Sequence, residues 1–226
     1  MTKLEKSFNE FWEEQFKNGW GGKWPCEEVI RFVARNFYKK DRANTKILDF
    51  GCGAGAHTWY LAKEGFDTYA FDGSASAIER LKVMLQQENL VADVQVKDGL
   101  QLDYPSEMFD GVIDNAVIYS NRIAHIKSMY TDIYHMLKQG GKLLTSSLFT
   151  TNTTGYKDGE ELEHNTFINI KSGPTAGGQT AHFFEDGEIE KILSEIGFYN
   201  IQVDILKRTD QGSKLVIEYF VVSAEK

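Results

Sequence analysis

From Thr45 onward, short hydrophobic runs alternate with longer segments in which hydrophobic residues recur at helical spacing. The short runs predict strands near residues 46–50, 67–72, 92–97, 109–115 and 140–148. The longer segments predict helices at about 55–64, 74–88 and 123–138. Strands that alternate with helices in this way are typical of a parallel sheet with right-handed crossovers.

The C-terminal part of the chain predicts a different connection. A helix at about 186–196 ends at Gly197, and two more strands follow near 200–208 and 214–223. The short link between those strands contains Gly212, which indicates an antiparallel hairpin. We therefore expect an α/β fold with a seven-stranded, mostly parallel sheet that ends in an antiparallel hairpin.

Two segments lie outside this alternation. Residues 1–44 predict two helices, because hydrophobic residues recur at helical spacing from Leu4 to Phe16 and again after Pro25. We interpret residues 1–44 as an N-terminal helical cover and 45–226 as one domain. Within that domain, residues 149–182 are rich in Thr, Asn and Gly and are too long for a plain connection, so we expect an insertion with one short strand at 166–170.

Composition narrows the class of protein. The chain has 226 residues, 42% hydrophobic and 26% charged, which is typical of a globular protein. Its net charge of −8 argues against general nucleic-acid binding, because phosphate contacts need clustered Lys and Arg. Cys26 and Cys52 lie too far apart for a metal-binding spacing, so we expect no metal and no disulfide framework. The N-terminus lacks the hydrophobic core of a signal peptide, and no hydrophobic run approaches about 18 residues, so we expect a cytoplasmic protein without a membrane span.

The strongest candidate for chemistry is a glycine turn at residues 51–55, which follows the first predicted strand and Asp49. A Gly-x-Gly-x-x-Ala pattern starts at Gly51, and Asp72 follows roughly 20 residues later, so a dinucleotide-binding site is one interpretation. A dinucleotide would place its pyrophosphate at the helix N-terminus, where Asp49 would repel it. S-adenosylmethionine brings an ammonium and a sulfonium instead, and a nearby carboxylate would attract both.

The segment 47–55, Ile-Leu-Asp-Phe-Gly-Cys-Gly-Ala-Gly, resembles the first motif of the class I S-adenosylmethionine-dependent methyltransferases. The resemblance continues to about Gly197 and includes the turn Lys-Gln-Gly-Gly-Lys at 138–142. The expected C-terminal hairpin also matches this family and differs from the usual NAD-binding fold. The resemblance implies a Rossmann-like, doubly wound sheet, S-adenosyl-L-methionine as cofactor and S-adenosyl-L-homocysteine as product.

Acidic residues that end predicted strands are the expected cofactor ligands, because ligands of such sheets bind beyond the carboxyl ends of the strands. Asp72 resembles the family's acid that accepts both ribose hydroxyls, Asp98 its acceptor for the adenine amine, and Asp114 ends the strand beside the sulfonium. Helix capping by Asp72 and a turn role for Asp98 remain alternatives. The predicted cofactor-binding residues are Asp49, Gly51, Gly53, Gly55, Asp72, Gly73, Ser74, Asp98, Gly99, Asp114 and Asn115.

The methyl acceptor is less defined. Residues 114–119 read Asp-Asn-Ala-Val-Ile-Tyr and depart from the Asn/Asp-Pro-Pro-aromatic motif of enzymes that methylate adenine or glutamine amino groups. That departure and the acidic charge favour a small-molecule acceptor, with Trp20 and Trp24 in a lid and residues 149–182 on the acceptor side. We expect no nucleic acid or membrane as partner, and a monomer or a homodimer.

No general base stands out in the sequence. The candidates are Tyr119, His125 and His182, although the pattern favours a solvated His125 and fits His182 in a packed aromatic cluster at least as well. His57, in the first turn of a predicted helix, is either solvated or close to the methionine end of the cofactor. A nicotinamide-dependent oxidoreductase and a non-catalytic cofactor-binding module remain alternative hypotheses.

Overall fold

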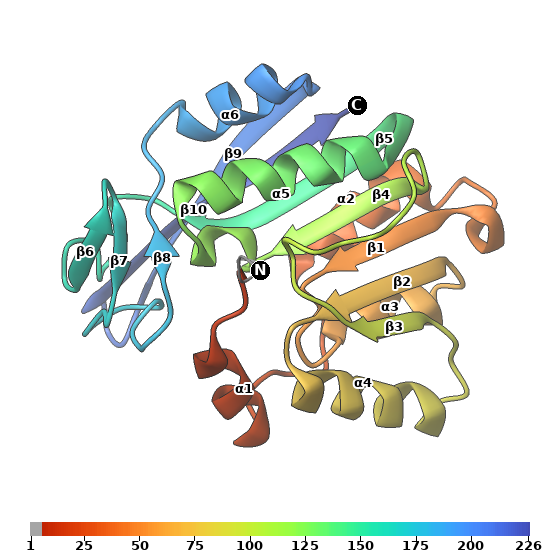
Figure 1. Cartoon of the computed structure of the whole chain (residues 1–226), viewed down its shortest axis with the longest axis horizontal. Coiled ribbons are helices and arrows are strands. Elements are labelled where there is room, and N and C mark those ends of the chain that lie inside the picture. The colour runs from red at the N-terminus through yellow and green to blue at the C-terminus, as the bar shows by residue number, and fades with distance from the viewer. Residues whose placement is uncertain (1–5) are drawn as a thin grey trace, which may run out of the picture.

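The computed structural model of the chain, which describes residues 6–226, is built around a seven-stranded sheet with the order β3-β2-β1-β4-β5-β10-β9 (Figure 1). The parallel strands are β1 (Lys46–Phe50), β2 (Asp67–Asp72), β3 (Asp93–Val96), β4 (Phe109–Asn115) and β5 (Leu137–Phe149). The antiparallel hairpin consists of β9 (Tyr199–Asp210) and β10 (Leu215–Glu225). The predicted α/β class, strand number and C-terminal hairpin are confirmed.

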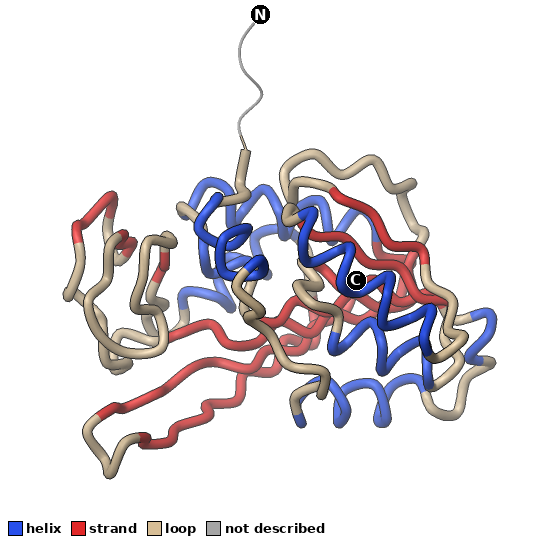
Figure 2. The backbone as a smooth tube through the Cα atoms, turned by 90° about the horizontal axis from the view of Figure 1, so that it is seen from below, coloured by secondary structure: helices blue, strands red, loops and turns tan. Residues whose placement is uncertain are grey.

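Helices cover both faces of this sheet, as Figure 2 shows. Adjacent residues of a strand point to opposite faces, so Ile47 packs in the cluster formed with α2 (Glu27–Phe37) and α3 (Ala56–Lys63), whereas Leu48 packs toward α5 (Ile123–Met136). The helix α4 (Ala75–Gln87) lies on the same face as α2 and α3, and α6 (Glu188–Ile196) lies on the same face as α5. Strands buried on both faces explain why the sequence shows continuous hydrophobic runs rather than alternation.

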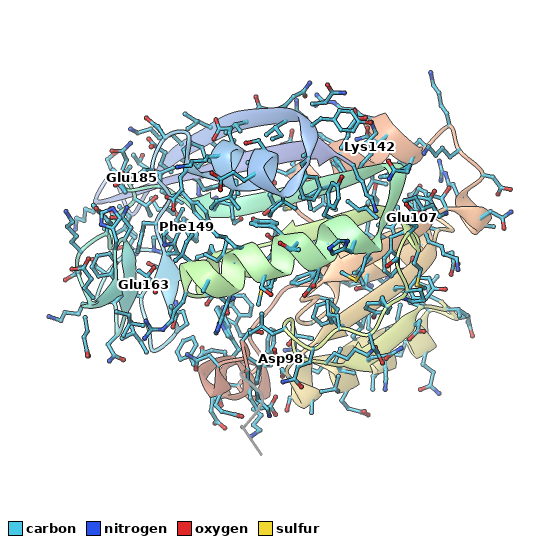
Figure 3. All side chains as sticks on the ribbon, turned by 45° about the horizontal axis from the view of Figure 1, so that its top comes forward. Asp98, Glu107, Lys142, Phe149, Glu163 and Glu185 are labelled. Carbon is cyan, nitrogen blue, oxygen red and sulfur yellow. The ribbon has the colours of Figure 1, made fainter. Side chains whose placement is uncertain are left out.

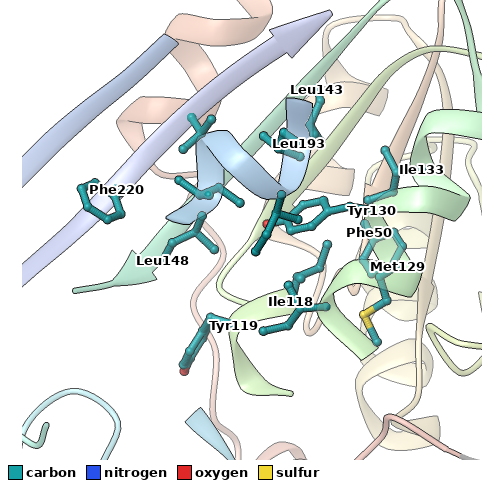
Figure 4. Packing of buried hydrophobic residues seen from close by; sticks show 14 of the residues in the cluster. Phe50, Ile118, Tyr119, Met129, Tyr130, Ile133, Leu143, Leu148, Leu193 and Phe220 are labelled. Carbon is teal, nitrogen blue, oxygen red and sulfur yellow. The ribbon is translucent and has the colours of Figure 1, made fainter. Parts of the chain in front are cut away.

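The largest hydrophobic cluster lies between α5 and the strands. Figure 4 shows Phe50, Met129 and Tyr130 within it, and all three side chains are buried. The helix ends at Met136 instead of near residue 138, because Leu137 is already extended with φ −71° and ψ 139°. The cluster holds the carboxyl ends of β1 and β4 against α5, and therefore fixes one wall of the region described below.

The N-terminal segment divides into two parts with different roles. The helix α1 (Glu10–Lys17) lies beside α4, whereas α2 packs its Val29, Val33 and Phe37 into the core. The prediction of one helical cover over residues 1–44 therefore does not describe α2, which belongs to the helical layer of the main domain. Leu4, which the helical spacing included, lies outside the described residues.

The insertion at 149–182 forms a small antiparallel sheet with the order β6-β7-β8 (Figures 1 and 2). Its strands are β6 (Glu160–Glu163), β7 (Thr166–Ile168) and β8 (Ala181–His182). The sequence predicted a single strand at 166–170, so β6 and β8 are additional. Among residues 6–226, no helix has the length and hydrophobicity needed to cross a bilayer.

Candidate functional site

A cavity of about 330 Å³ opens at the carboxyl ends of the central strands. The glycine turn after β1, residues 71–73 at the end of β2 and residues 115–117 at the end of β4 form its floor. Residues of the N-terminal segment between Ser7 and Cys26 form the opposite wall. The cavity therefore lies where ligands of open α/β sheets generally bind.

The glycine turn needs its glycines for two physical reasons. Gly51, Gly53 and Gly55 have φ values of +69°, +51° and +90°, a region that residues with a Cβ rarely adopt. A Cβ on Gly55 would also lie 2.2 Å from Leu81 Cδ1, and one on Gly51 would lie 2.5 Å from Val117 Cγ1. The turn leads directly into α3, whose N-terminal amides suit a negatively charged group.

Asp72 is the acid that reaches the cavity. Its Oδ2 accepts a hydrogen bond from Gly53 N and its Oδ1 one from Ser74 N, both at 2.8 Å. Burial raises the pKa of this carboxyl to about 6, against the lowering effect of these two amides. Gly73 also lines the cavity, whereas Ser74 caps α4 by accepting from Ala77 N. Each carboxylate oxygen keeps a further lone pair for a ligand hydroxyl.

Asp49 and Asp114 do not line the cavity. Asp49 is buried beneath the glycine turn and accepts a hydrogen bond from Thr58 Oγ1 at 2.5 Å. Asp114 accepts from the amides of Val117 and Ile118 and from Thr145 Oγ1, and burial raises its pKa to about 7. The geometry gives no support to the predicted direct contact of these two carboxyls with the cofactor, because both are held inside the fold.

Asp98 is engaged by the N-terminal segment. Its carboxylate accepts hydrogen bonds from Ser7 N, Ser7 Oγ, Phe8 N and Leu100 N at 2.8–3.0 Å, and Figure 3 shows it beside α1. Partial burial would raise the pKa of Asp98, but these hydrogen bonds lower it overall. Gly99 lines the cavity and Asp98 does not. The predicted hydrogen bond from the adenine amine to Asp98 therefore stays a prediction, and this structure offers the carboxylate other donors.

The N-terminal segment forms a cover over the cavity, which we define as residues 7–26. Phe8 lies over Gly73, Phe16 lies over Gly53, and both side chains line the cavity. Glu13 in α1 anchors this cover, because its carboxylate accepts the hydroxyls of Ser74 at 2.5 Å and Ser76 at 2.6 Å. The cover thus runs from the end of β3 to the glycine turn. Trp20 and Trp24 lie within it and line the cavity, and their action as a lid stays a prediction.

None of the three predicted catalytic candidates lines the cavity. Tyr119 is buried with its ring against Phe149, and burial raises its pKa. His182 is buried between Thr166 Oγ1 at 2.8 Å and Glu188 Oε1 at 3.0 Å, where it joins the small sheet to α6. His125 is half-buried on α5 and does not line the cavity. The geometry therefore gives no support to the predicted catalytic role of these three residues.

Other polar groups line the cavity in their place. Cys26, His57, Asn115, Ser120 and Asn121 do so, and of these only Asn115 belonged to the predicted cofactor-binding set. Burial lowers the pKa of His57, and its Nε2 accepts the Cys26 amide at 3.4 Å. Within residues 6–226, no group of three or more His, Cys, Asp and Glu side chains is placed to hold a metal ion.

Comparison with known proteins finds methyltransferases with a similar domain and fold. A methyltransferase-domain family model matches residues 47–141. The fold resembles an S-adenosylmethionine-dependent methyltransferase of Methanosarcina mazei, with a TM-score of 0.70 and 18% identity over 86% of this chain and 96% of that one. Residues 47–141 thus match a methyltransferase domain, and the matches support the predicted resemblance to the class I S-adenosylmethionine-dependent methyltransferases. S-adenosylmethionine is the cofactor of that family.

The proteins that this chain resembles carry names that refer to different substrates. The chain is 32% identical to an uncharacterized methyltransferase of Synechocystis over 42% of this chain and 43% of that protein. It is 30% identical to phosphoethanolamine N-methyltransferase 1 of Zea mays over 60% of this chain and 26% of that protein. The chain thus spans less than half the length of these two relatives. A 1,6-didemethyltoxoflavin-N1-methyltransferase of Burkholderia thailandensis shares the fold with a TM-score of 0.65, at 17% identity over 94% of this chain and 84% of that one.

Proposed function

We propose that this chain catalyses S-adenosylmethionine-dependent methyl transfer to a small-molecule acceptor. The observation that carries the proposal is the single cavity in which the glycine turn, the Asp72 carboxylate and the N-terminal cover meet. The parts of the cavity fit the parts of the cofactor. The two Asp72 oxygens suit the vicinal ribose hydroxyls, and the amides at the start of α3 suit the methionine carboxylate. Gly73 and Gly99 border the region left for the adenosine, under Phe8.

When bound, S-adenosylmethionine supplies an electrophilic methyl carbon on a positively charged sulfur. The methyl group would pass to a lone pair of the acceptor, and the cofactor would leave as neutral-sulfur S-adenosylhomocysteine. A proton on a neutral N–H or O–H acceptor would be released to solvent once the product leaves the cavity. The protein positions the acceptor in line and excludes bulk water, which are the main contributions of a protein to such a transfer.

A small acceptor is favoured by the way the cavity is closed. Asn9 Nδ2 donates to Gly178 O at 3.3 Å, and Phe11 lies against Gly177, so the N-terminal cover contacts the 149–182 insertion. Ser120 Oγ donates to Thr180 O at 2.7 Å and ties the same insertion to the connection after β4. The cover and the insertion thus meet around the cavity, and that arrangement suits a molecule that is enclosed rather than a macromolecular surface. The net charge of −8 also disfavours a nucleic-acid substrate.

Isothermal titration calorimetry with S-adenosylmethionine and S-adenosylhomocysteine tests the proposal. We expect both to bind the wild type, and Asp72→Ala to weaken binding at least tenfold. Asp67→Ala, at the opposite end of the same strand, is the matched control and should leave the affinity unchanged. Absence of binding to the wild type would contradict the proposal, as would NAD raising the melting temperature while S-adenosylhomocysteine does not.

A further inference from the structure

The connection from β4 to α5 lines the part of the cavity that lies away from Asp72. Asn115, Ser120 and Asn121 are its polar members, and Ser120 is already bonded to the insertion. The adenosine and methionine parts of the cofactor are assigned above to the ends of β2 and β3 and to the start of α3. The side chains of Asn115 and Asn121 are therefore available to the acceptor.

Asn115 is held in a fixed orientation by hydroxyl groups. Its Oδ1 accepts hydrogen bonds from Ser146 Oγ at 2.6 Å and Ser147 Oγ at 3.4 Å. The structure gives its Nδ2 no partner anywhere in residues 6–226, and the side chain lines the cavity. Ala116 and Ser147 next to it have φ values of +62° and +60°, and such strained backbone concentrates at functional sites. Asn115 thus presents two N–H donors to the cavity.

In Asn121 the amide nitrogen, rather than the oxygen, is bound within the protein. Its Nδ2 donates to Val117 O at 3.5 Å and to Ile118 O at 3.3 Å, and the side chain is only 7% exposed. Its Oδ1 has no partner among the described residues, and the residue lines the cavity. Asn121 thus presents a neutral hydrogen-bond acceptor to the same cavity as the donors of Asn115.

The cavity offers no free charge to bind a charged acceptor. Among its lining residues, the only formally charged side chains are Asp72 and Lys97. Lys97 forms an ion pair with Asp103 and lies 4.6 Å from the centre of the Tyr104 ring. Asp72 is assigned to the ribose. The protein therefore supplies no free side-chain cation for an anionic acceptor, which would face only the sulfonium of the cofactor. An ammonium acceptor would lie beside that sulfonium with no free carboxylate, which is costly.

We infer that the methyl acceptor is an uncharged molecule with an amide-like edge, whose carbonyl oxygen accepts from Asn115 Nδ2 and whose N–H or O–H donates to Asn121 Oδ1. This inference rests on the proposed methyltransferase function and adds the substrate class. Sites built from neutral hydrogen-bonding groups discriminate strongly against ligands that leave those groups unpaired. Asn115, expected from the sequence to contact the cofactor, is thereby assigned to the acceptor.

Matched acceptor pairs test the inference. We would measure acceptor-dependent formation of S-adenosylhomocysteine with nicotinamide against nicotinate, salicylamide against salicylate, and 2-mercaptobenzamide against 2-mercaptobenzoate, with phosphoethanolamine as a further anion. We expect at least one amide to be used with a kcat/KM at least tenfold above that of its acid. Preference for the acids or phosphoethanolamine, equal use of both members, or no turnover with any amide while S-adenosylhomocysteine binds would overturn the inference. Failure of S-adenosylhomocysteine to bind at all would instead count against the proposed function.

Variants separate acceptor recognition from folding. Asn115→Asp keeps the oxygen that Ser146 and Ser147 contact but removes the donors, so we expect kcat/KM for the amide to fall at least tenfold. Asn121→Leu should have a similar effect, and both variants should bind S-adenosylhomocysteine within twofold of wild type. Asn89→Asp, an exposed substitution after α4, is the matched control and should leave both values unchanged. An unchanged kcat/KM in folded Asn115→Asp would refute the assignment.

Discussion

The Asp72 carboxyl should make cofactor affinity depend on pH in the range from 5 to 8. Burial raises its pKa to about 6, and the amides of Ser74 and Gly53 already use part of its accepting capacity. Only the ionised carboxylate can accept two ribose hydroxyls in addition to these amides, because a protonated carboxyl gives up one accepting site to its own proton. Binding should therefore require loss of this proton, and affinity should rise as the pH rises through 6.

The magnitude follows from the ionised fraction. With a pKa of about 6, about one carboxyl in eleven is ionised at pH 5 and nearly all are ionised at pH 8. The Kd for S-adenosylhomocysteine should thus be about elevenfold higher at pH 5 than at pH 8, which corresponds to roughly 1.4 kcal/mol. Titration calorimetry in buffers of different ionisation enthalpy measures both the affinity and the proton released on binding. S-adenosylhomocysteine is the preferred probe because it lacks the sulfonium charge.

Two variants show whether the effect comes from this carboxyl. Asp72→Asn should bind more weakly at pH 8 and should lose the pH dependence. Asp114→Asn should retain it, because Asp114 is buried away from the cavity although its own pKa is raised to about 7. An affinity of the wild type that is constant from pH 5 to 8, or an unchanged slope in Asp72→Asn, would refute the assignment of Asp72 to the ribose.

Three further predictions concern the framework of the site. Gly55→Ala should lower the free energy of unfolding, measured in urea, by roughly 2–3 kcal/mol, because its Cβ would lie 2.2 Å from Leu81. Gly65→Ala is the control: Gly65 has φ +86° but open space around it, so the loss should be only about 1 kcal/mol. Equal losses in the two variants would contradict the steric argument. The folded pKa of Asp114 is about 7, above its unfolded value, so stability falls progressively as the pH rises from about 4 to about 7. In urea denaturation, Asp114→Asn should therefore gain more stability over wild type at pH 8 than at pH 5; a difference that is the same at both pH values would disprove this. Glu13→Ala removes the acceptor for the Ser74 and Ser76 hydroxyls at the start of α4. We expect calorimetry to show roughly fivefold weaker binding of S-adenosylhomocysteine, with little change in melting temperature. Unchanged affinity would show that the anchoring of the cover by Glu13 does not contribute to binding.

The central sheet could be predicted because its signals are local. Strands buried on both faces have continuous hydrophobic runs, and β1, β2 and β4 begin and end where those runs do. The glycine turn was recognisable because positive φ values restrict the choice of residue. Right-handed crossovers then limit how such strands can be ordered.

The strands β6 and β8 of the 149–182 insertion could not be predicted, because their residues show no hydrophobic pattern typical of strands. β6 is the charged segment Glu160–Glu163, and β8 has only two residues, Ala181 and His182. Both strands are held by backbone hydrogen bonds to β7, which carry no residue preference of their own. His182 was a catalytic candidate for the same reason, because its partners Thr166 and Glu188 become neighbours only once that sheet has formed.

The function of the acids at the ends of the strands could not be predicted from their positions in the sequence alone. A place at the end of a parallel strand locates a carboxyl near the site, but strand register decides which way it points. Asp114 is in register with Phe50 and Thr145, so it points toward α5 and is taken up by Thr145 inside the fold. Asp98 is engaged by Ser7, which is 91 residues away in the sequence. Asp72 alone of these three acids remains available to a ligand, which is why its titration is the most informative probe of the site.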